Sequence, residues 1–177
     1  EYAAKNGLNL HIHQIGDEAA TFALNELEKV EKQYPELKNN RVCFAHCQFI
    51  KDSDKKRMKE LGVAAIVAPY WAVMDDYYWD VYLPIMSSKT ALDTQYPMNS
   101  LIKNGINIAF HSDYVVTKPD MGWLYYSAQT RTLPQKIFNL WYGEDTKDYI
   151  RTTDKNKSQD PKEYTKSKLI GPLKNWD

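Results

Sequence analysis

Residues 41–68 read RVCFAHCQFIKDSDKKRMKELGVAAIVA, and they contain the clearest folding signal in the chain. The apolar run Val42–His46 predicts a strand, and the polar residues 51–54 then begin a helix that ends at Gly62. Residues 63–68 form an uninterrupted apolar run, which is typical of a strand covered by helices on both sides or built into a barrel wall. The stretch is therefore a strand, helix and strand unit.

The same alternation continues toward both termini. Residues 8–13 predict a strand, and residues 19–34 predict an amphipathic helix that Asp17 caps at its N-terminus. Toward the C-terminus, residues 98–104 predict a helix and residues 106–110 predict another strand. Such alternation favours an α/β fold with parallel strands and right-handed crossovers, either a doubly wound sheet or a segment of a barrel.

Length and composition are those of an ordinary globular protein. The chain has 177 residues, of which 43% are hydrophobic and 26% charged, so it is long enough for one domain with a hydrophobic core. We treat residues 1–177 as a single domain. Residues 145–168 are rich in Lys, Asp, Thr and Ser, and we expect them to form a polar loop or excursion.

Charge and hydropathy argue against two classes of partner. Basic and acidic residues both number 23, so the net charge is zero and no basic field exists to attract nucleic acid or anionic lipid. No apolar run approaches the roughly 20 residues that cross a bilayer, and the first residues lack the order of a signal peptide. We expect no nucleic-acid partner and no membrane partner, with the cytoplasm as the default compartment.

The histidines are few and lie at informative places. All four of them, His11, His13, His46 and His111, lie on or at the ends of predicted strands, and Asp113 follows the last. In parallel α/β folds, active-site groups project from the C-terminal ends of neighbouring strands. Imidazole and carboxylate suit zinc, iron or manganese, and an open coordination position lets such an ion activate water. The competing interpretation is that these are core or surface histidines without a ligand.

Period-2 alternation along the strand extends this hypothesis to its neighbours. If His46 faces a site, then Cys43, Ala45 and Cys47 face the other way, toward the covering helices. The two cysteines are then buried apolar residues.

The aromatic residues are also unevenly distributed. Thirteen tyrosines and five tryptophans are present, many of them in residues 70–82 and 123–149. Such segments either surround a ligand cleft or an interface, or simply pack within loops, and the sequence does not separate these alternatives.

Three phrases together resemble the amidohydrolase superfamily, specifically its family-3 branch. They are HQIGDEA at residues 13–19, RVCFAHCQ at residues 41–48 and GINIAFHSD at residues 105–113. In that family the corresponding phrases end barrel strands five, six and eight. The resemblance covers roughly residues 1–135 and implies a partial (β/α)8 TIM barrel, strands five to eight with their helices, as the C-terminal half of a metal-dependent hydrolase.

The resemblance also implies roles for single residues. His13 and His46 would be metal ligands, and Asp113 would be both a ligand and the general acid/base. The metal would be a divalent ion, in the first place zinc, with one or two ions in the complete enzyme. The implied reaction is hydrolysis of a C–N bond in a small-molecule amide, formamide or cyclic amide by metal-activated water. Tyr70 and Trp71 would line the substrate mouth.

The chain departs from the family pattern in ways that bear on function. The family's strand-one His-x-His pair and its strand-four ligand have no counterpart here, and four strands do not close an eight-stranded barrel. We therefore expect a fragment that is inactive alone, whose exposed edges and apolar surface favour a homo-oligomer. His111 stands where Gly is commoner in the family, and Ala45 and Cys47 flank His46 where Glu and Ala are commoner.

Two alternatives stay open. One is a non-catalytic α/β binding or interaction module in which His13, His46 and Asp113 are merely strand-end residues. The other is a complete protein that descends from a hydrolase and keeps only a partner-binding role. Metal binding separates the hydrolase from the binding module.

Overall fold

The computed structural model describes residues 1–86, 92–144, 148–153 and 168–173. The chain forms two compact units. Of the described residues, the first comprises 1–67 and 96–110, and the second comprises 68–86, 92–95, 111–144, 148–153 and 168–173.

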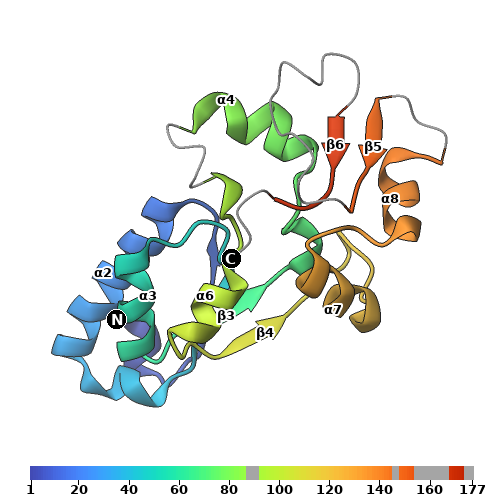
Figure 1. The fold of residues 1–177 in the computed structure, drawn as a ribbon. Coiled ribbons are helices and arrows are strands. Elements are labelled where there is room, and N and C mark those ends of the chain that lie inside the picture. The colour runs from blue at the N-terminus through green and yellow to red at the C-terminus, as the bar shows by residue number, and fades with distance from the viewer. Residues whose placement is uncertain (87–91, 145–147, 154–167, 174–177) are drawn as a thin grey trace. The chain divides into compact units, whose positions relative to one another are not determined.

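A four-stranded parallel sheet forms the centre of the first unit (Figure 1). Its strands are β1 (Leu10–Gln14), β2 (Val42–His46), β3 (Ala64–Val67) and β4 (Ile108–Phe110), in that spatial order. The helices are α1 (Tyr2–Lys5), α2 (Asp17–Gln33), α3 (Asp52–Glu60) and α6 (Met98–Lys103), with the 3-10 helix η1 (Pro35–Asn39) after α2. The predicted α/β class with parallel strands is confirmed.

The strand order places the connecting helices on one face of the sheet. Helices α2, α3 and α6 each lie between one strand and the next, and right-handed crossovers that advance in one direction all lie on the same side. Helix α2 contacts β1, α3 packs against α2, and α6 contacts β4. The sheet is therefore singly wound. It is not the doubly wound alternative, in which helices cover both faces.

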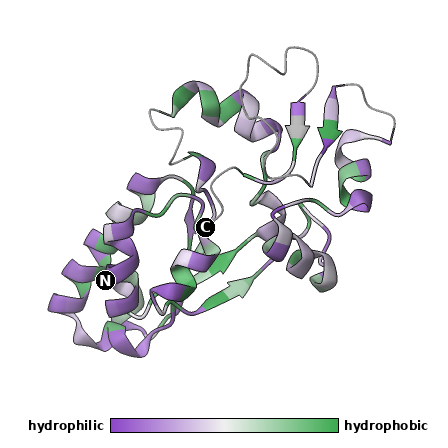
Figure 2. Ribbon diagram, viewed as in Figure 1, coloured by the Kyte–Doolittle hydropathy of each residue, from purple (hydrophilic) through white to green (hydrophobic). Residues whose placement is uncertain are grey.

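The sheet buries one row of side chains and leaves the alternate row more open. The buried row contains Val42, Phe44 and Ala65. In the alternate row His11 and His13 are exposed at the β1 edge of the sheet. Figure 2 shows hydrophobic residues on β3 and β4 and mainly hydrophilic ones along α2 and α3. This is the pattern of strands that helices cover on one face.

The beginning of α2 differs from the prediction. Gly16, rather than Asp17, is the N-cap residue, with a φ of 96°. Asp17 is the first helical residue, and its Oδ1 accepts a hydrogen bond from Glu18 N at 2.9 Å. Because glycine adopts a positive φ without steric cost, the chain turns into the helix one residue earlier than expected.

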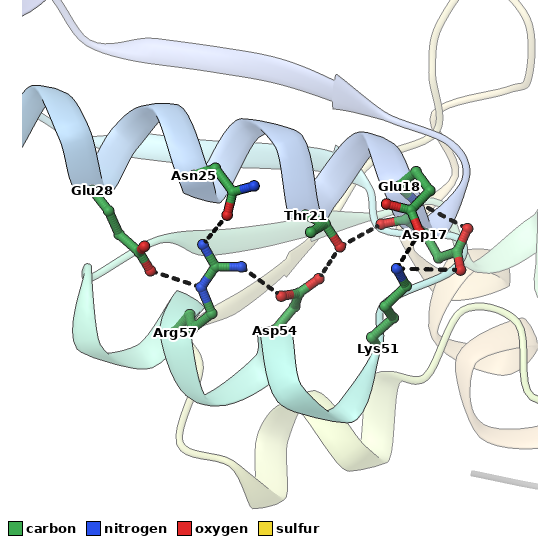
Figure 3. Close-up of polar contacts among 8 residues, drawn as sticks. All are labelled: Asp17, Glu18, Thr21, Asn25, Glu28, Lys51, Asp54 and Arg57. Carbon is green, nitrogen blue, oxygen red and sulfur yellow. Dashed lines mark hydrogen bonds and ion pairs between the residues drawn. The ribbon is translucent and has the colours of Figure 1, made fainter.

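A polar network joins α2 to α3 (Figure 3). Arg57 donates from Nε to Glu28, from one terminal nitrogen to Asp54 and from the other to Asn25, at 2.7, 2.8 and 2.7 Å. Thr21 Oγ1 donates to the other Asp54 oxygen at 2.5 Å. Asp54 is only 2% exposed, so its charge depends on these partners. The hydrogen bond from Arg57 holds the pKa of Glu28 below its ordinary value.

The second unit is built around an aromatic-rich core. Its elements are η2 (Pro69–Trp71), the π-helical turn η3 (Tyr78–Tyr82), α4 (Leu83–Ile85), α7 (Met121–Thr130), α8 (Gln135–Tyr142) and the parallel pair β5 (Tyr149–Arg151) and β6 (Lys168–Ile170). The core comprises Tyr70, Val73, Leu124, Leu133, Ile137, Phe138 and Ile170, against which Trp71, Trp123, Trp141, Tyr142 and Tyr149 pack. These aromatic residues therefore serve packing within the unit.

Tyr70 is fully buried and its hydroxyl donates to Asp120 O at 3.2 Å, so the prediction that it lines an open mouth is wrong.

The polar loop expected at residues 145–168 lies largely outside the described residues, and its described part contains strand β5. No described helix is both long enough and apolar enough to cross a membrane.

Candidate metal centre

His13 and His46 lie side by side at the C-terminal ends of two adjacent strands. His13 is the penultimate residue of β1, and His46 is the last residue of β2. Their ring centroids are 4.3 Å apart, and the ring planes are inclined by 64°. The structure therefore brings two of the predicted ligands together.

A strained turn explains how the two rings meet. The strand register pairs Gln14 with His46 and His13 with Ala45, so strict alternation would place His13 and His46 on opposite faces of the sheet. The chain instead makes a γ-turn at His46, whose φ is 69°, with Cys47 N donating to Ala45 O at 2.9 Å. Positive φ is uncommon for a bulky residue and costs free energy. Such strain is found preferentially at functional sites.

Of the two neighbouring cysteines, Cys47 is not suited to metal binding. Cys47 is buried, and its Sγ donates to Phe44 O at 3.3 Å. Burial raises the pKa of the Cys47 thiol to about 12, so it stays protonated at neutral pH. Cys43 is half-buried. The prediction that the cysteines are buried apolar residues is thus confirmed for Cys47 and only partly for Cys43.

Gln14 is a polar residue beside this pair that the sequence analysis did not single out. It ends β1, directly after His13, and its side chain is 2% exposed. Its Oε1 has no hydrogen-bond partner among the described residues. A buried acceptor without a partner is costly in a finished fold, and it is typical of a site that takes a further group. The sequence signal was only its position next to His13.

Asp113 belongs to the second unit and is half-buried. Its φ is 56°, again in the left-handed region, and its backbone O accepts hydrogen bonds from Val116 N at 2.6 Å and Thr117 N at 3.4 Å. His111, two residues earlier, is also half-buried. The structure therefore does not join Asp113 to His13 and His46 within one compact unit.

The imidazole pair fits a divalent cation as part of a ligand set. The two ring centroids lie 4.3 Å apart, and neutral imidazole is a good ligand for zinc, iron and manganese. Within the described part of either unit, no group of three or more His, Cys, Asp or Glu side chains is arranged to hold a metal. The pair is therefore two imidazoles, fewer than the three or more protein ligands that metal sites of hydrolases use.

A second group that the sequence did not reveal is Asp75 in the second unit. Its Oδ1 accepts a hydrogen bond from Tyr78 N at 2.8 Å. Burial raises the pKa of Asp75 from its ordinary value of 3.8 to about 7, the neighbouring Asp76 adds to this, and the bond from Tyr78 opposes it. Asp76 accepts a hydrogen bond from Tyr142 Oη at 2.9 Å. Near neutral pH, Asp75 is therefore partly protonated.

Asp75 predicts a specific dependence of stability on pH. The folded state keeps the Asp75 proton up to about pH 7, whereas the unfolded state releases it near pH 3.8. The stability that Asp75 contributes to the fold is therefore complete below pH 3.8 and declines as the pH rises to about 7. Asp75→Asn is expected to remove that decline and to raise the free energy of unfolding above pH 7 by roughly 2 kcal/mol. Urea unfolding from pH 4 to 8 measures it. The exposed Asp80→Asn is the control, and equal slopes for the wild type and Asp75→Asn would contradict the assignment.

Comparison with known proteins agrees with the fold. A sequence model described as the amidohydrolase family matches residues 1–147. Among solved structures, uncharacterized metal-dependent hydrolases from Pyrococcus horikoshii OT3 and Pyrococcus furiosus are similar, with TM-scores of 0.56 and sequence identities of 23% and 22%. The matches cover 72% and 71% of this chain but only 23% and 24% of those proteins, so the chain spans about a quarter of their length. None of the curated proteins matches it.

Proposed function

Because the chain belongs to the amidohydrolase family, we propose that it is part of a metal-dependent hydrolase in which His13 and His46 bind a divalent metal ion. The observation that carries this proposal is the convergence of the two imidazole rings, 4.3 Å apart, at the C-terminal ends of adjacent parallel strands. That edge is where enzymes built on parallel strands place their catalytic groups. Asp113 would complete the site as a further ligand and as the general acid/base.

The proposal includes the architecture of the whole protein. Residues 1–177 would form a single partial domain, strands five to eight of a (β/α)8 barrel, within a longer chain. The singly wound order of β1 to β4 supports this, because barrels place all their helices on the outside. Exposed His11 and His13 in the alternate row fit residues that point into a barrel. The short span relative to the similar structures also supports a longer protein.

The proposed reaction is hydrolysis of a C–N bond in an amide, formamide or cyclic amide. A divalent ion, zinc in the first place, would polarise the carbonyl and make water a stronger nucleophile. The Asp113 carboxylate would accept a proton from the attacking water and deliver it to the departing nitrogen as the C–N bond breaks. Cys47 would take no part, because its side chain is buried and its Sγ donates to Phe44 O.

Metal content tests the proposal. In the full-length protein, elemental analysis is expected to find a divalent ion near stoichiometric amounts in the wild type and depleted in His13→Ala and His46→Ala, because each loses a ligand. His11→Ala is the matched control, since His11 lies on β1 and is exposed like His13. Wild-type protein that stays metal-free after folding with zinc would contradict the hydrolase and favour a non-catalytic binding module.

Self-association of the isolated chain is part of the same proposal. Strand β1 is at the edge of the sheet, and beside it a groove of about 450 Å³ is lined mainly by apolar side chains, among them Leu10, Ile12 and Phe22. Open strand edges and apolar grooves promote pairing with another chain. The isolated chain would therefore form a homo-oligomer and be inactive alone.

A further inference from the structure

Short connections follow both candidate metal ligands in the first unit. Asp17, where α2 begins, comes four residues after His13, and Lys51, the N-cap residue of α3, comes five residues after His46. Short connections leave the chain few conformations, so the helix ends restrict where the preceding strand ends lie. The geometry of the histidine pair therefore depends on how the two helix ends are held together.

Lys51 bridges those two helix ends (Figure 3). Its Nζ donates to Glu18 Oε1 and lies 3.8 Å from Asp17 Oδ2, both in the first turn of α2. The hydrogen bond to Glu18 raises the pKa of Lys51, so the ammonium form is retained. The same two connections share a backbone hydrogen bond from Gln48 N to Gln14 O, at 3.4 Å. The connections that follow the two histidines are thus linked through main chain and side chain.

The Lys51 bridge contributes little to overall stability. The side chain of Lys51 is 35% exposed and that of Glu18 is 80% exposed, and exposed ion pairs contribute about 0 to 1 kcal/mol. The contacts of Arg57 with Glu28 and Asn25, and of buried Asp54 with Thr21, are farther along the helix pair and are the stronger link between α2 and α3. Lys51 is therefore well placed to affect the position of the helix ends more than the free energy of unfolding.

We propose that Lys51 is a positioning residue for the candidate metal centre. By bridging Asp17 and Glu18, it holds the two strand ends in the arrangement where the rings of His13 and His46 converge. This inference rests on the proposed function. A positive charge close to a cation repels it, so removal of the charge alone would tighten metal binding, whereas loss of positioning weakens it. The two explanations predict opposite signs.

The test compares three variants of the full-length protein by chelator competition for zinc and by thermal unfolding. Lys51→Met is expected to weaken zinc binding about tenfold, the lower end of the range for groups that orient metal ligands. Lys51→Arg is expected to restore most of the affinity, because it keeps the charge and the donor. Lys38→Met is the matched control, since Lys38 pairs with Glu31 at 3.7 Å near the opposite end of α2. It is expected to lower thermal stability as little as Lys51→Met does and to leave affinity unchanged.

Zinc binding by Lys51→Met that equals or exceeds that of the wild type would overturn the inference and leave the proposed function standing. A second measurement does not depend on metal. In metal-free protein, the nuclear Overhauser effect between the ring protons of His13 and His46 is expected in the wild type and in Lys38→Met, and is expected to be lost in Lys51→Met. If the wild type bound no zinc, the proposed function would fail. The nuclear Overhauser effect would still decide the role of Lys51, because a signal that persisted in Lys51→Met would refute the positioning role.

Discussion

Replacing Asp113 with Asn is expected to lower kcat of the full-length protein by about 10² to 10⁴, the usual contribution of a positioned general acid/base. The amide nearly matches the carboxylate in size but does not accept the proton. Asn also tolerates the positive φ of 56° at this position, so the local backbone should be kept. Turnover at saturating zinc, over amides, formamides and cyclic amides, measures the effect.

The control for Asp113→Asn is Asp120→Asn. Asp120 caps α7 by accepting a hydrogen bond from Trp123 N at 3.0 Å, and Asn is an equally good cap, so stability and turnover are expected to stay near wild type. Both variants lose one negative charge from the same segment, which separates proton transfer from a general effect of charge. An Asp113→Asn enzyme with more than about half of the wild-type kcat would contradict the catalytic role, because lost proton transfer costs orders of magnitude.

Replacing Arg57 with Met is expected to reduce the free energy of unfolding by about 3 kcal/mol. Asp54, which is 2% exposed, would keep its hydrogen bond from Thr21 and lose the guanidinium that balances its charge. Met retains the apolar part of the side chain, so lost packing contributes little. Urea unfolding at pH 7 measures the change, and an unchanged m-value would show that the denatured state is not affected.

The matched control for Arg57→Met is Lys29→Met. Lys29 pairs with Glu26 at 2.5 Å on the exposed face of α2, where an ion pair contributes about 0.5 kcal/mol or less. A double variant, Arg57→Met with Asp54→Ala, is expected to be less destabilised than the sum of the two single changes, because no buried charge is left without a partner. If Arg57→Met costs no more than Lys29→Met, the network is not a significant link between α2 and α3.

The strands of the first unit could be predicted from the sequence because the patterns that indicate them are local. The apolar run Val42–His46 coincides with β2, and the run at residues 63–68 contains β3. Apolar periodicity and helix-ending glycines act over a few residues, so they can be recognised without knowing which strands pair. The choice between a doubly wound and a singly wound sheet was not local. It required the strand order, which depends on pairings between distant residues.

The candidate site could be predicted only in part from the sequence. The sequence indicated His13 and His46 as strand-end residues, but strict alternation placed them on opposite faces once the register was known. The left-handed backbone of His46 resolves this conflict, and nothing in the side-chain pattern indicates it. Asp113, identified from the family resemblance, has a positive φ of its own that was equally hidden. Strained conformations persist because the surrounding structure holds them, so they are not local properties.

The sequence by itself determined the four strands, their helices and the placement of histidines at strand ends, because these follow from periodicity and from residues that begin and end helices. The tertiary structure decided which side chains meet. It brought the rings of His13 and His46 together, buried Gln14 beside them, and enclosed Tyr70 within a core. Such contacts depend on strand register and on packing between segments far apart in the chain, and short-range patterns alone do not determine either.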